Sequence, residues 1–367
     1  MFLQSSISLL DSISPYFSVK STKYGGRGCF ANYDLTEGTI IHQCLLPLSS
    51  SIRRPFKKEV CEYCFSYFYG KTLKYKLMSL YFCSQSCLNS FQEMDIDNIY
   101  LQSLFNVENL FVKGLKRQQS NQREDEDKEE EMIRQLENEF KQSENIELFI
   151  DEKWKQMEIE CDLLLSKLKT KERINLIPSI NENEYLDIKY IIGILFQMYK
   201  QDFCLANNNI LSFELDLFEH LQLNDVAKVC AYPFLLYSYL KIYKFLKLST
   251  ISQLECYVNT SMIRSIIAKN LTNAFGIRSL DEPDGNKEFF GYALYPSASF
   301  FNHSCQPNVI HIRIGSKKVF QLSRNVEKDE ELVISYTPFE NIELEKRKQE
   351  IKEWFFDCIC QRCINKE

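Results

Sequence analysis

The chain has 367 residues, of which 45% are hydrophobic and 26% are charged, and its formal net charge at pH 7 is -6. A chain of this length can bury one large core or two to three smaller ones. The sequence has no uninterrupted run of about 18 to 20 apolar residues and no signal-peptide pattern, so we expect no membrane span and residence in the cytoplasm or nucleus. The negative charge argues against strong direct nucleic-acid binding.

The first predicted elements are short strands. Residues 17–48 contain the turn Gly25-Gly26-Arg27-Gly28 and alternating apolar runs, which predict two or three strands. A cysteine-rich segment at 57–93 ends in a strand or knuckle that enters a short helix. Residues 96–270 are mostly helical by the spacing of their apolar side chains. Within them, the charged stretch 116–145 predicts a solvated helix or a disordered insertion, because it has too few apolar residues to offset the cost of ordering.

Short strand-like runs return between residues 287 and 336. Residues 309–314 and 318–322 are separated by Gly315-Ser316, which predicts a hairpin. The hairpin joins two motifs, Asn302-His303-Ser304-Cys305 before it and Glu331-Leu332-Val333-Ile334-Ser335-Tyr336 after it. Taken alone, the first could be an ordinary turn and the second an ordinary strand end.

Seven of the fourteen cysteines fall into two clusters with the short spacings that tetrahedral zinc sites use. The first cluster consists of two pairs, Cys61 with Cys64 and Cys83 with Cys87. The second consists of Cys358, Cys360 and Cys363. Two short pairs can close on one ion, whereas three thiolates leave a tetrahedron one ligand short. The sequence therefore predicts one complete zinc site, and either an incomplete second site or three free thiols near the C-terminus.

In this order, the glycine-rich turn, the first cysteine cluster and the two later motifs resemble the SET-domain protein lysine methyltransferases of the SET-and-MYND type, and in particular their short fungal members. The resemblance spans about residues 17 to 363. It implies an α+β fold with short curved sheets and a pseudoknot, split by a zinc finger and a helical insertion. The implied parts are the N-terminal SET part (17–56), a half-MYND-like zinc module (57–95), the helical insertion (96–250), the C-terminal SET core (251–340) and a post-SET zinc segment (341–367).

The resemblance also bears on the metal sites. Complete MYND fingers interleave a second zinc site, and this chain lacks its ligands: the residues that stand roughly in their places are Lys74, Leu77, Asp95 and Ile99. The finger therefore looks halved. At the other end of the chain, the resemblance implies that Cys305 is the fourth ligand beside the three C-terminal cysteines. Two structural zinc ions are thus expected.

The resemblance implies S-adenosylmethionine as the methyl donor and a catalytic role for Tyr336. Trp354, where the family more often has tyrosine, is expected to line the lysine channel. Asn302 is expected to hold the amino group of the cofactor. The full implied set of cofactor-binding residues is Arg27, Gly28, Asn273, Ser299, Phe301, Asn302, His303, Tyr336 and Phe356. Without the resemblance, Asn273 is equally a polar residue at a helix end, and the glycine-rich turn is equally a hairpin turn.

The expected activity is methyl transfer to the side-chain amine of a lysine in a histone or non-histone protein. The expected partner is thus a protein with an exposed lysine, a histone tail being one candidate, and we expect a monomer. The alternative is a catalytically weak or inactive SET scaffold that acts as an interaction module. The halved finger and Trp354 favour the alternative, whereas the presence of Asn302, His303 and Tyr336 favours the enzyme.

Overall fold

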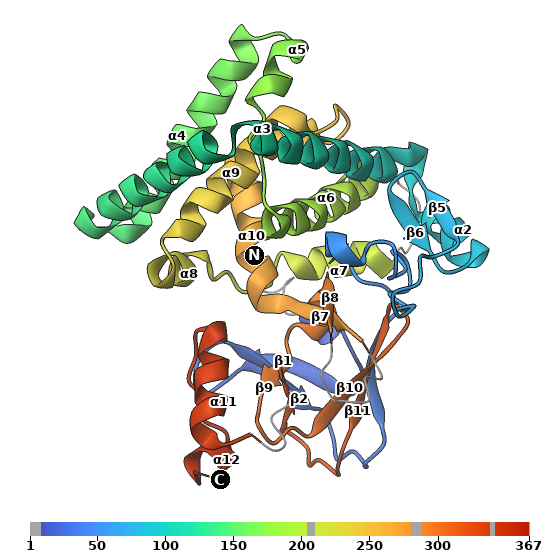
Figure 1. Cartoon of the computed structure of the whole chain (residues 1–367). Coiled ribbons are helices and arrows are strands. Elements are labelled where there is room, and N and C mark those ends of the chain that lie inside the picture. The colour runs from blue at the N-terminus through green and yellow to red at the C-terminus, as the bar shows by residue number, and fades with distance from the viewer. Residues whose placement is uncertain (1–8, 204–209, 280–287, 338–341, 367) are drawn as a thin grey trace. The chain divides into compact units, whose positions relative to one another are not determined.

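The computed structural model describes residues 9–203, 210–279, 288–337 and 342–366 (Figure 1). Helices and short sheets both contribute, so the α+β class predicted from the sequence is confirmed. Contacts divide the chain into two compact units. The first contains Met1–Leu48, Asn208–Leu221 and Leu294–Glu367, and the second contains Ser49–Asn207 and Gln222–Ala293. Each unit therefore combines segments that are far apart in the sequence.

Two small sheets form the framework of the first unit. The four-stranded sheet contains, in spatial order, β1 (Phe17–Ser21), β2 (Arg27–Ala31), β12 (Glu331–Ile334) and β9 (Asn302–His303). The three-stranded sheet contains β10 (Val309–Ile314), β11 (Lys317–Leu322) and β3 (Ile40–Cys44). In the first sheet β12 pairs antiparallel with β2 and parallel with β9. One strand thus lies beside both the glycine-rich turn and the Asn302-His303 motif.

The hairpin predicted between the two late motifs is confirmed. Strands β10 and β11 pair antiparallel from Val309 opposite Leu322 to Ile314 opposite Lys317. Gly315 has φ +62°, a backbone conformation that glycine adopts at the first position of a two-residue hairpin turn without steric cost. The ring of Phe320 on β11 is fully buried and stacks on Phe301 at a centroid distance of 5.0 Å. The hairpin thereby helps to form the core beneath the Asn302-His303 motif.

The helices of the first unit are short. They are α7 (Ile210–Phe218), η5 (Pro296–Ala298), α11 (Leu344–Ile351), η6 (Lys352–Trp354) and α12 (Gln361–Ile364). Helix α7 comes from the middle of the sequence, and its buried Glu214 is bonded to η5. The Glu214 carboxylate accepts from the Ser297 backbone N–H at 2.8 Å and from the Ser297 hydroxyl at 2.5 Å. These bonds fix α7 against the segment that leads into Asn302.

The second unit contains the first cysteine cluster and most of the helices. Its strands are β4 (Ser49–Ile52), β5 (Tyr75–Leu77), β6 (Leu80–Phe82), β7 (Ala274–Arg278) and β8 (Phe289–Leu294). The predicted strand that enters a short helix is confirmed, because β6 is followed by α2 (Gln85–Met94). The Ser84 hydroxyl accepts from the Cys87 backbone N–H and caps this helix at its N-terminus.

The longer helices of the second unit are α3 (Ile99–Gln142), α4 (Ile146–Lys167), α6 (Glu182–Phe203), α8 (Asp225–Ala231), α9 (Phe234–Ser249) and α10 (Thr260–Asn273). Of these, α3, α9 and α10 pack against α6. Shorter helical pieces are α5 (Thr170–Arg173), η1 (Arg54–Phe56), η2 (Ile96–Asn98), η3 (Ile174–Leu176) and η4 (Glu255–Tyr257). Most residues of α6 between Glu184 and Met198 are buried. None of the helices in the described ranges is long and apolar enough to cross a membrane.

Residues 116–142 of the charged stretch lie within α3, so of the two expected states the structure has the helix. Glu129, in this stretch, forms an ion pair with Lys241 of α9 at 2.5 Å, and the Lys241 side chain is only 8% exposed. Near the C-terminal end of α3, Glu139 forms an ion pair with Lys153 of α4. Part of the acidic charge is therefore used to dock α3 on its neighbouring helices.

Candidate active site and metal centres

Tyr336 follows strand β12 and contacts the Asn302-His303 segment through two hydrogen bonds. Its backbone N–H donates to His303 Nδ1 at 3.1 Å, and its hydroxyl donates to the Phe301 carbonyl oxygen at 3.1 Å. Burial lowers the pKa of His303 to about 4, so the imidazole is neutral and Nδ1 can accept. Burial also raises the pKa of Tyr336, so its hydroxyl stays protonated at neutral pH. The phenol is therefore held with its hydrogen engaged and its oxygen lone pairs available.

Two aromatic side chains near the C-terminus lie beside Tyr336. The ring centroid of Trp354 is 5.9 Å from that of Tyr336. The ring of Phe356 is edge-on to that of Tyr336 with 6.3 Å between the ring centroids, and its centroid lies 6.1 Å from that of the His303 ring. Phe355 between them has φ +62° and ends η6. Aromatic faces of this kind attract an alkylammonium group without requiring hydrogen bonds to it.

Asn302 connects three segments of the first unit. Its Nδ2 lies 2.9 Å from the Arg27 carbonyl oxygen in β2 and 2.9 Å from Glu331 Oε1 in β12. It also lies 3.0 Å from the Tyr24 hydroxyl in the glycine-rich turn. Gly28 lies directly beneath these groups, because a Cβ built on it would be 2.7 Å from Asn302 Nδ2. Four segments of the predicted cofactor site, the turn, β2, β12 and β9, thus meet at one side chain.

Three other residues of the predicted cofactor site face other parts of the first unit. The Arg27 guanidinium donates to the His220 carbonyl oxygen and lies over the Phe300 ring. The Phe301 ring is 1% exposed within the core, so its carbonyl oxygen is the group that reaches Tyr336. The Ser299 hydroxyl donates to the Tyr295 carbonyl oxygen at 3.0 Å.

Asn273 belongs to the second unit, whereas the other predicted cofactor-binding residues belong to the first. It is the last residue of α10. Its Nδ2 donates to the Lys269 carbonyl oxygen at 2.7 Å and lies 3.1 Å from the Gln222 carbonyl oxygen. These contacts are those of a polar residue that closes a helix end.

Cys305 lies beside the three C-terminal cysteines. The four sulfur atoms of Cys305, Cys358, Cys360 and Cys363 lie within 4.8 Å of one another. Cys305 Sγ is 3.9 Å from Cys358 Sγ and 3.6 Å from Cys363 Sγ. Tetrahedral zinc with Zn–S bonds of about 2.3 Å requires sulfur atoms about 3.8 Å apart. This group could therefore hold a zinc-sized ion. Tyr336 and Trp354 pack against a buried cluster that contains two of its members, Cys305 and Cys363, with Ile351.

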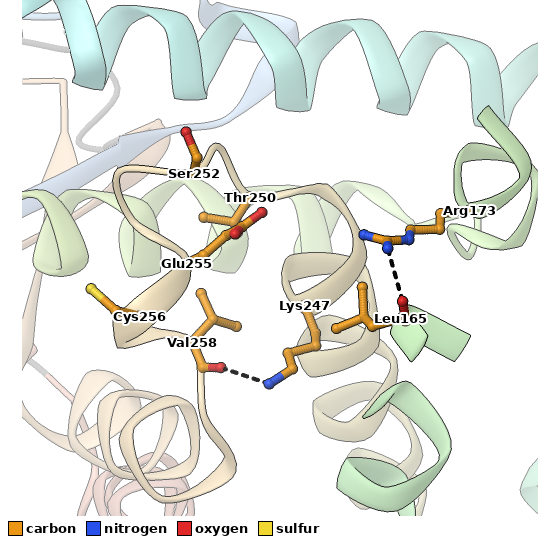
Figure 2. Close-up of a pocket in the computed structure, with 8 residues that line it drawn as sticks. All are labelled: Leu165, Arg173, Lys247, Thr250, Ser252, Glu255, Cys256 and Val258. Atoms are coloured by element: carbon orange, nitrogen blue, oxygen red, sulfur yellow. Dashed lines mark hydrogen bonds between the residues drawn. The ribbon is translucent and has the colours of Figure 1, made fainter. Parts of the chain in front are cut away.

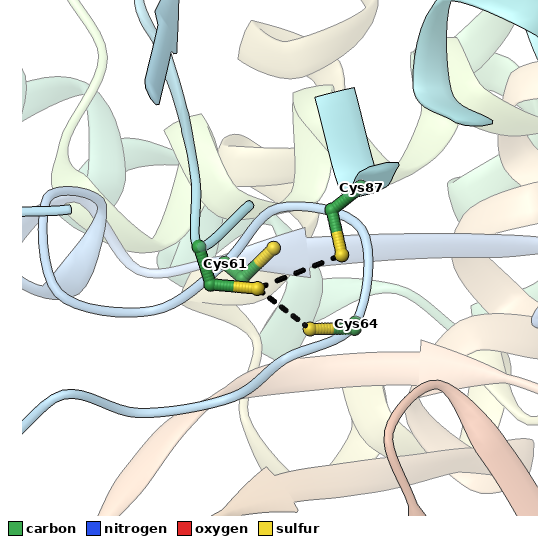
Figure 3. A group of neighbouring side chains, drawn as sticks. Cys61, Cys64 and Cys87 are labelled. Carbon is green, nitrogen blue, oxygen red and sulfur yellow. Dashed lines mark hydrogen bonds between the residues drawn. The ribbon is translucent and has the colours of Figure 1, made fainter. Parts of the chain in front are cut away.

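The second group lies in the other unit and consists of Cys61, Cys64, Cys83 and Cys87. Figure 3 shows the labelled side chains converging from the loop that carries Cys61 and Cys64 and from Cys87 in the first turn of α2. Cys83 Sγ lies 3.5 Å from both Cys64 Sγ and Cys87 Sγ. A hydrogen bond from the Cys61 thiol lowers the pKa of Cys64 below its usual value. Four such ligands fit a closed structural zinc site.

A pocket of about 480 Å³ lies in the second unit, beside Lys247 of α9 and Arg173 of α5 (Figure 2). Both cations already contact main-chain carbonyl groups: Arg173 donates to Leu165 O at 2.8 Å, and Lys247 lies 3.5 Å from Val258 O. These carbonyl groups lie at or near helix ends, where such cations usually satisfy the backbone. No predicted site residue lines this pocket, and we assign it no role in the reaction.

Comparison with known proteins identifies the family. The SET domain family model matches residues 26–337. The chain belongs to the SET-domain family. It is 31% identical over 378 residues to a potential protein lysine methyltransferase, SET6, of Saccharomyces cerevisiae, and the match covers 96% of this chain and 95% of that protein.

Matches to SET-and-MYND proteins are shorter. A SET and MYND domain-containing protein of Dictyostelium discoideum is 42% identical over 101 residues, which is 27% of this chain and 25% of that protein. Human histone-lysine N-methyltransferase SMYD3 is 35% identical over 96 residues, which is 26% of this chain and 21% of that protein. The SET-and-MYND resemblance therefore holds for part of the chain, whereas the yeast relative matches nearly all of it.

Several polar residues of this SET domain were not predicted from the sequence. Tyr24 and Glu331 contact Asn302, and Glu214 holds Ser297. His42 Nε2 lies 2.9 Å from the same Ser297 hydroxyl. Glu331 begins the motif that ends at Tyr336, but its position in a strand does not predict a contact with Asn302. No spacing in the sequence connects Glu214 to Ser297, which are 83 residues apart.

Proposed function

We propose that this SET-domain chain is an S-adenosylmethionine-dependent protein lysine N-methyltransferase. The observation that carries the proposal is the setting of Tyr336. Its hydroxyl donates to the Phe301 carbonyl oxygen, its ring lies beside Trp354 and Phe356, and it packs against the buried cluster that contains Cys305 and Cys363. The near full-length similarity to a yeast protein named as a potential lysine methyltransferase supports the same activity.

For methyl transfer the protein needs mainly to position the reacting groups and to exclude water. S-adenosylmethionine, when bound, supplies both the methyl group and its own leaving group. The target lysine must be a neutral amine, and an apolar channel lowers the pKa of a lysine by penalising its charged form. Trp354 is proposed to provide an apolar wall of this kind. Because the Tyr336 hydrogen is engaged with Phe301 O, the phenol oxygen can accept a hydrogen bond from the amine and hold it in line.

The cofactor-binding residues are proposed to be Arg27, Gly28, Asn273, Ser299, Phe301, Asn302, His303, Tyr336 and Phe356. Arg27 is proposed to act through its backbone, because its guanidinium is bonded to His220 O. Phe301 is likewise proposed to act through its carbonyl group. Asn273 is proposed to act from the end of α10.

The two cysteine groups are proposed to hold one structural zinc ion each, and the donor set of each group fits this metal. The group with Cys305 would tie the C-terminal segment, and with it Trp354, to the Asn302-His303 motif. The group at residues 57–95 is proposed to be a half-MYND-like module, and residues 341–367 a post-SET segment. The remaining boundaries are proposed at residues 17–56, 96–250 and 251–340.

The substrate is proposed to be a protein with an exposed lysine. Human and mouse relatives are named as histone-lysine N-methyltransferases, which makes a histone tail one candidate. We propose that the chain works as a monomer in the cytoplasm or nucleus. Its net charge of -6 suits a basic substrate segment better than a nucleic acid.

The proposal is tested by cofactor titration and single-turnover methylation with the zinc-quantified protein. Wild type should bind S-adenosylmethionine with micromolar affinity. Tyr336→Phe should keep that affinity and lose at least about tenfold in methyl transfer, equivalent to about 1.4 kcal/mol of transition-state stabilisation. Tyr33→Phe, whose half-exposed hydroxyl bonds only to Pro15 O among the described contacts, is the matched control. Two bound zinc ions without cofactor binding would favour the interaction-module alternative.

A further inference from the structure

The orientation of the Asn302 amide is determined by its neighbours. Its Nδ2 faces the Arg27 carbonyl oxygen and the Glu331 carboxylate, each at 2.9 Å. Carbonyl and carboxylate oxygens accept hydrogen bonds and do not donate them, so the nitrogen end of the amide must point at them. The Asn302 Oδ1 atom therefore points the other way. Among the described residues, no donor contacts this oxygen.

Tyr24 completes the arrangement from the glycine-rich turn. Its hydroxyl donates to the same Glu331 Oε1 that faces Asn302, and it lies 3.0 Å from Asn302 Nδ2. The Tyr24 side chain is 51% exposed, so its position depends on this hydrogen bond more than on core packing. Tyr24, Glu331 and Asn302 form a triad that connects the turn, the start of β12 and β9.

The backbone beneath the triad allows this close approach. A Cβ on Gly28 would lie 2.5 Å from Glu331 Oε1 and 2.7 Å from Asn302 Nδ2, both shorter than real Cβ contacts. Glycine at position 28 therefore leaves the space that the carboxylate and the amide occupy. The negative charge of Glu331 is thus brought to the part of the site where the resemblance expects the polar end of the cofactor.

We propose that Glu331 and Tyr24 are positioning residues that orient Asn302 Oδ1 toward the α-ammonium group of S-adenosylmethionine. This inference rests on the proposed function. Glu331 acts in two ways, because it accepts from the amide nitrogen and adds a negative charge near the ammonium. Tyr24 acts through Glu331, by holding its carboxylate in place. The triad should therefore affect recognition of the amino-acid end of the cofactor and leave recognition of the adenosine end unchanged.

The experiment compares two ligands that differ at that end. S-adenosylhomocysteine carries the ammonium group, and 5′-methylthioadenosine lacks the whole amino-acid portion. Glu331→Gln should weaken S-adenosylhomocysteine binding by about tenfold, the usual effect of losing one charge-assisted contact, without changing 5′-methylthioadenosine binding. Tyr24→Phe should weaken the binding of S-adenosylhomocysteine by about threefold and leave the binding of 5′-methylthioadenosine unchanged. The double variant should bind S-adenosylhomocysteine no worse than Glu331→Gln does, because Tyr24 acts through Glu331.

Glu327→Gln is the matched control. It removes the same charge from an exposed position four residues earlier and should leave both affinities unchanged. Equal weakening of both ligands by Glu331→Gln would mean that the triad only maintains the fold of the turn, and would overturn the inference. Unchanged affinity for S-adenosylhomocysteine would overturn it as well. If Glu331→Gln does not fold, the affinities of Tyr24→Phe for the two ligands decide between these outcomes. Failure of wild type to bind either ligand would instead reject the proposed function.

Discussion

A buried ion pair beside the first cysteine group gives a quantitative test of the structure. Glu62 stands between Cys61 and Cys64, and its carboxylate lies 3.0 Å from Lys189 Nζ of α6. The two side chains are only 6% and 3% exposed. A charge in such surroundings has lost its water and depends on its partner. Lys189→Met should therefore leave an uncompensated carboxylate beside Cys61 and Cys64, two of the proposed zinc ligands.

The expected cost follows from that burial. Removing one partner of a buried pair costs about 3–5 kcal/mol of unfolding free energy, whereas replacing both partners by uncharged groups is often close to neutral. Lys189→Met should thus lower the stability of the second unit by about 3–5 kcal/mol. Adding Glu62→Leu should recover most of that loss. Because Glu62 is adjacent to Cys61, Lys189→Met should also speed the release of one zinc ion to a chelator.

The control is an ion pair that is shorter but exposed. Lys20 Nζ and Asp329 Oδ1 are 2.7 Å apart, with side chains 46% and 60% exposed, and such solvent-screened pairs contribute little to stability. Urea unfolding of Lys20→Met and Lys189→Met in zinc-saturated buffer compares the two, and chelator kinetics reports the metal. A cost for Lys189→Met as small as that for Lys20→Met would refute the reasoning from burial.

Three further changes have expected outcomes. Cys360→Ser should release one of two zinc ions and weaken cofactor binding, as metal analysis and titration would report; retention of both ions would contradict it. Burial lowers the pKa of Lys228 to about 8, and its Nζ has no hydrogen-bond partner among the described residues. Because the unfolded chain then binds more protons, wild-type stability should rise between about pH 8 and pH 10.5, by up to about 3 kcal/mol. Lys228→Met should abolish this rise and increase stability at pH 7, which unfolding at several pH values would check. Glu214→Ala should leave the Ser297 backbone N–H unpaired, whereas the Ser297 hydroxyl keeps His42 Nε2 at 2.9 Å. The expected cost is about 1–3 kcal/mol, measured by thermal unfolding beside Glu214→Gln, which should cost less.

The predictions from the sequence that are confirmed depended on local pattern. The hairpin at 309–322 follows from strand-like runs around Gly315-Ser316, and both features lie within fourteen consecutive residues. The short spacing within each pair, Cys61 with Cys64 and Cys83 with Cys87, predicts that its two sulfur atoms lie close together, and the structure brings both pairs into one group. The state of the charged stretch in α3 could not be decided from composition. Its helix is supported by contacts such as Glu129 with Lys241, which are 112 residues apart.

The unpredicted residues share a different property. Glu214 and Ser297 meet because α7 joins the first unit, and neither residue has a local pattern that marks the contact. Tyr24 and Glu331 are 307 residues apart and meet only when β2 and β12 pair. Residues that act through a partner from a distant segment become visible only once the pairing of strands is known. The grouping of Asn302, His303 and Tyr336 could be predicted because the family resemblance places their two motifs in one site.

Strand β12 explains why so many of these contacts depend on one another. Its parallel pairing sets Val333 opposite Asn302 and Ile334 opposite His303. The same register brings Glu331, at the start of the strand, to the Asn302 amide, and Tyr336, just past its end, to His303 Nδ1. Glu331 and Tyr336 are therefore at most about 17 Å apart along an extended strand. Because side chains alternate along a strand, a slip of one residue would turn Glu331 away from Asn302 and separate Tyr336 from His303. The orientation of the proposed cofactor-binding amide and the position of the proposed catalytic phenol are therefore set by a single strand register.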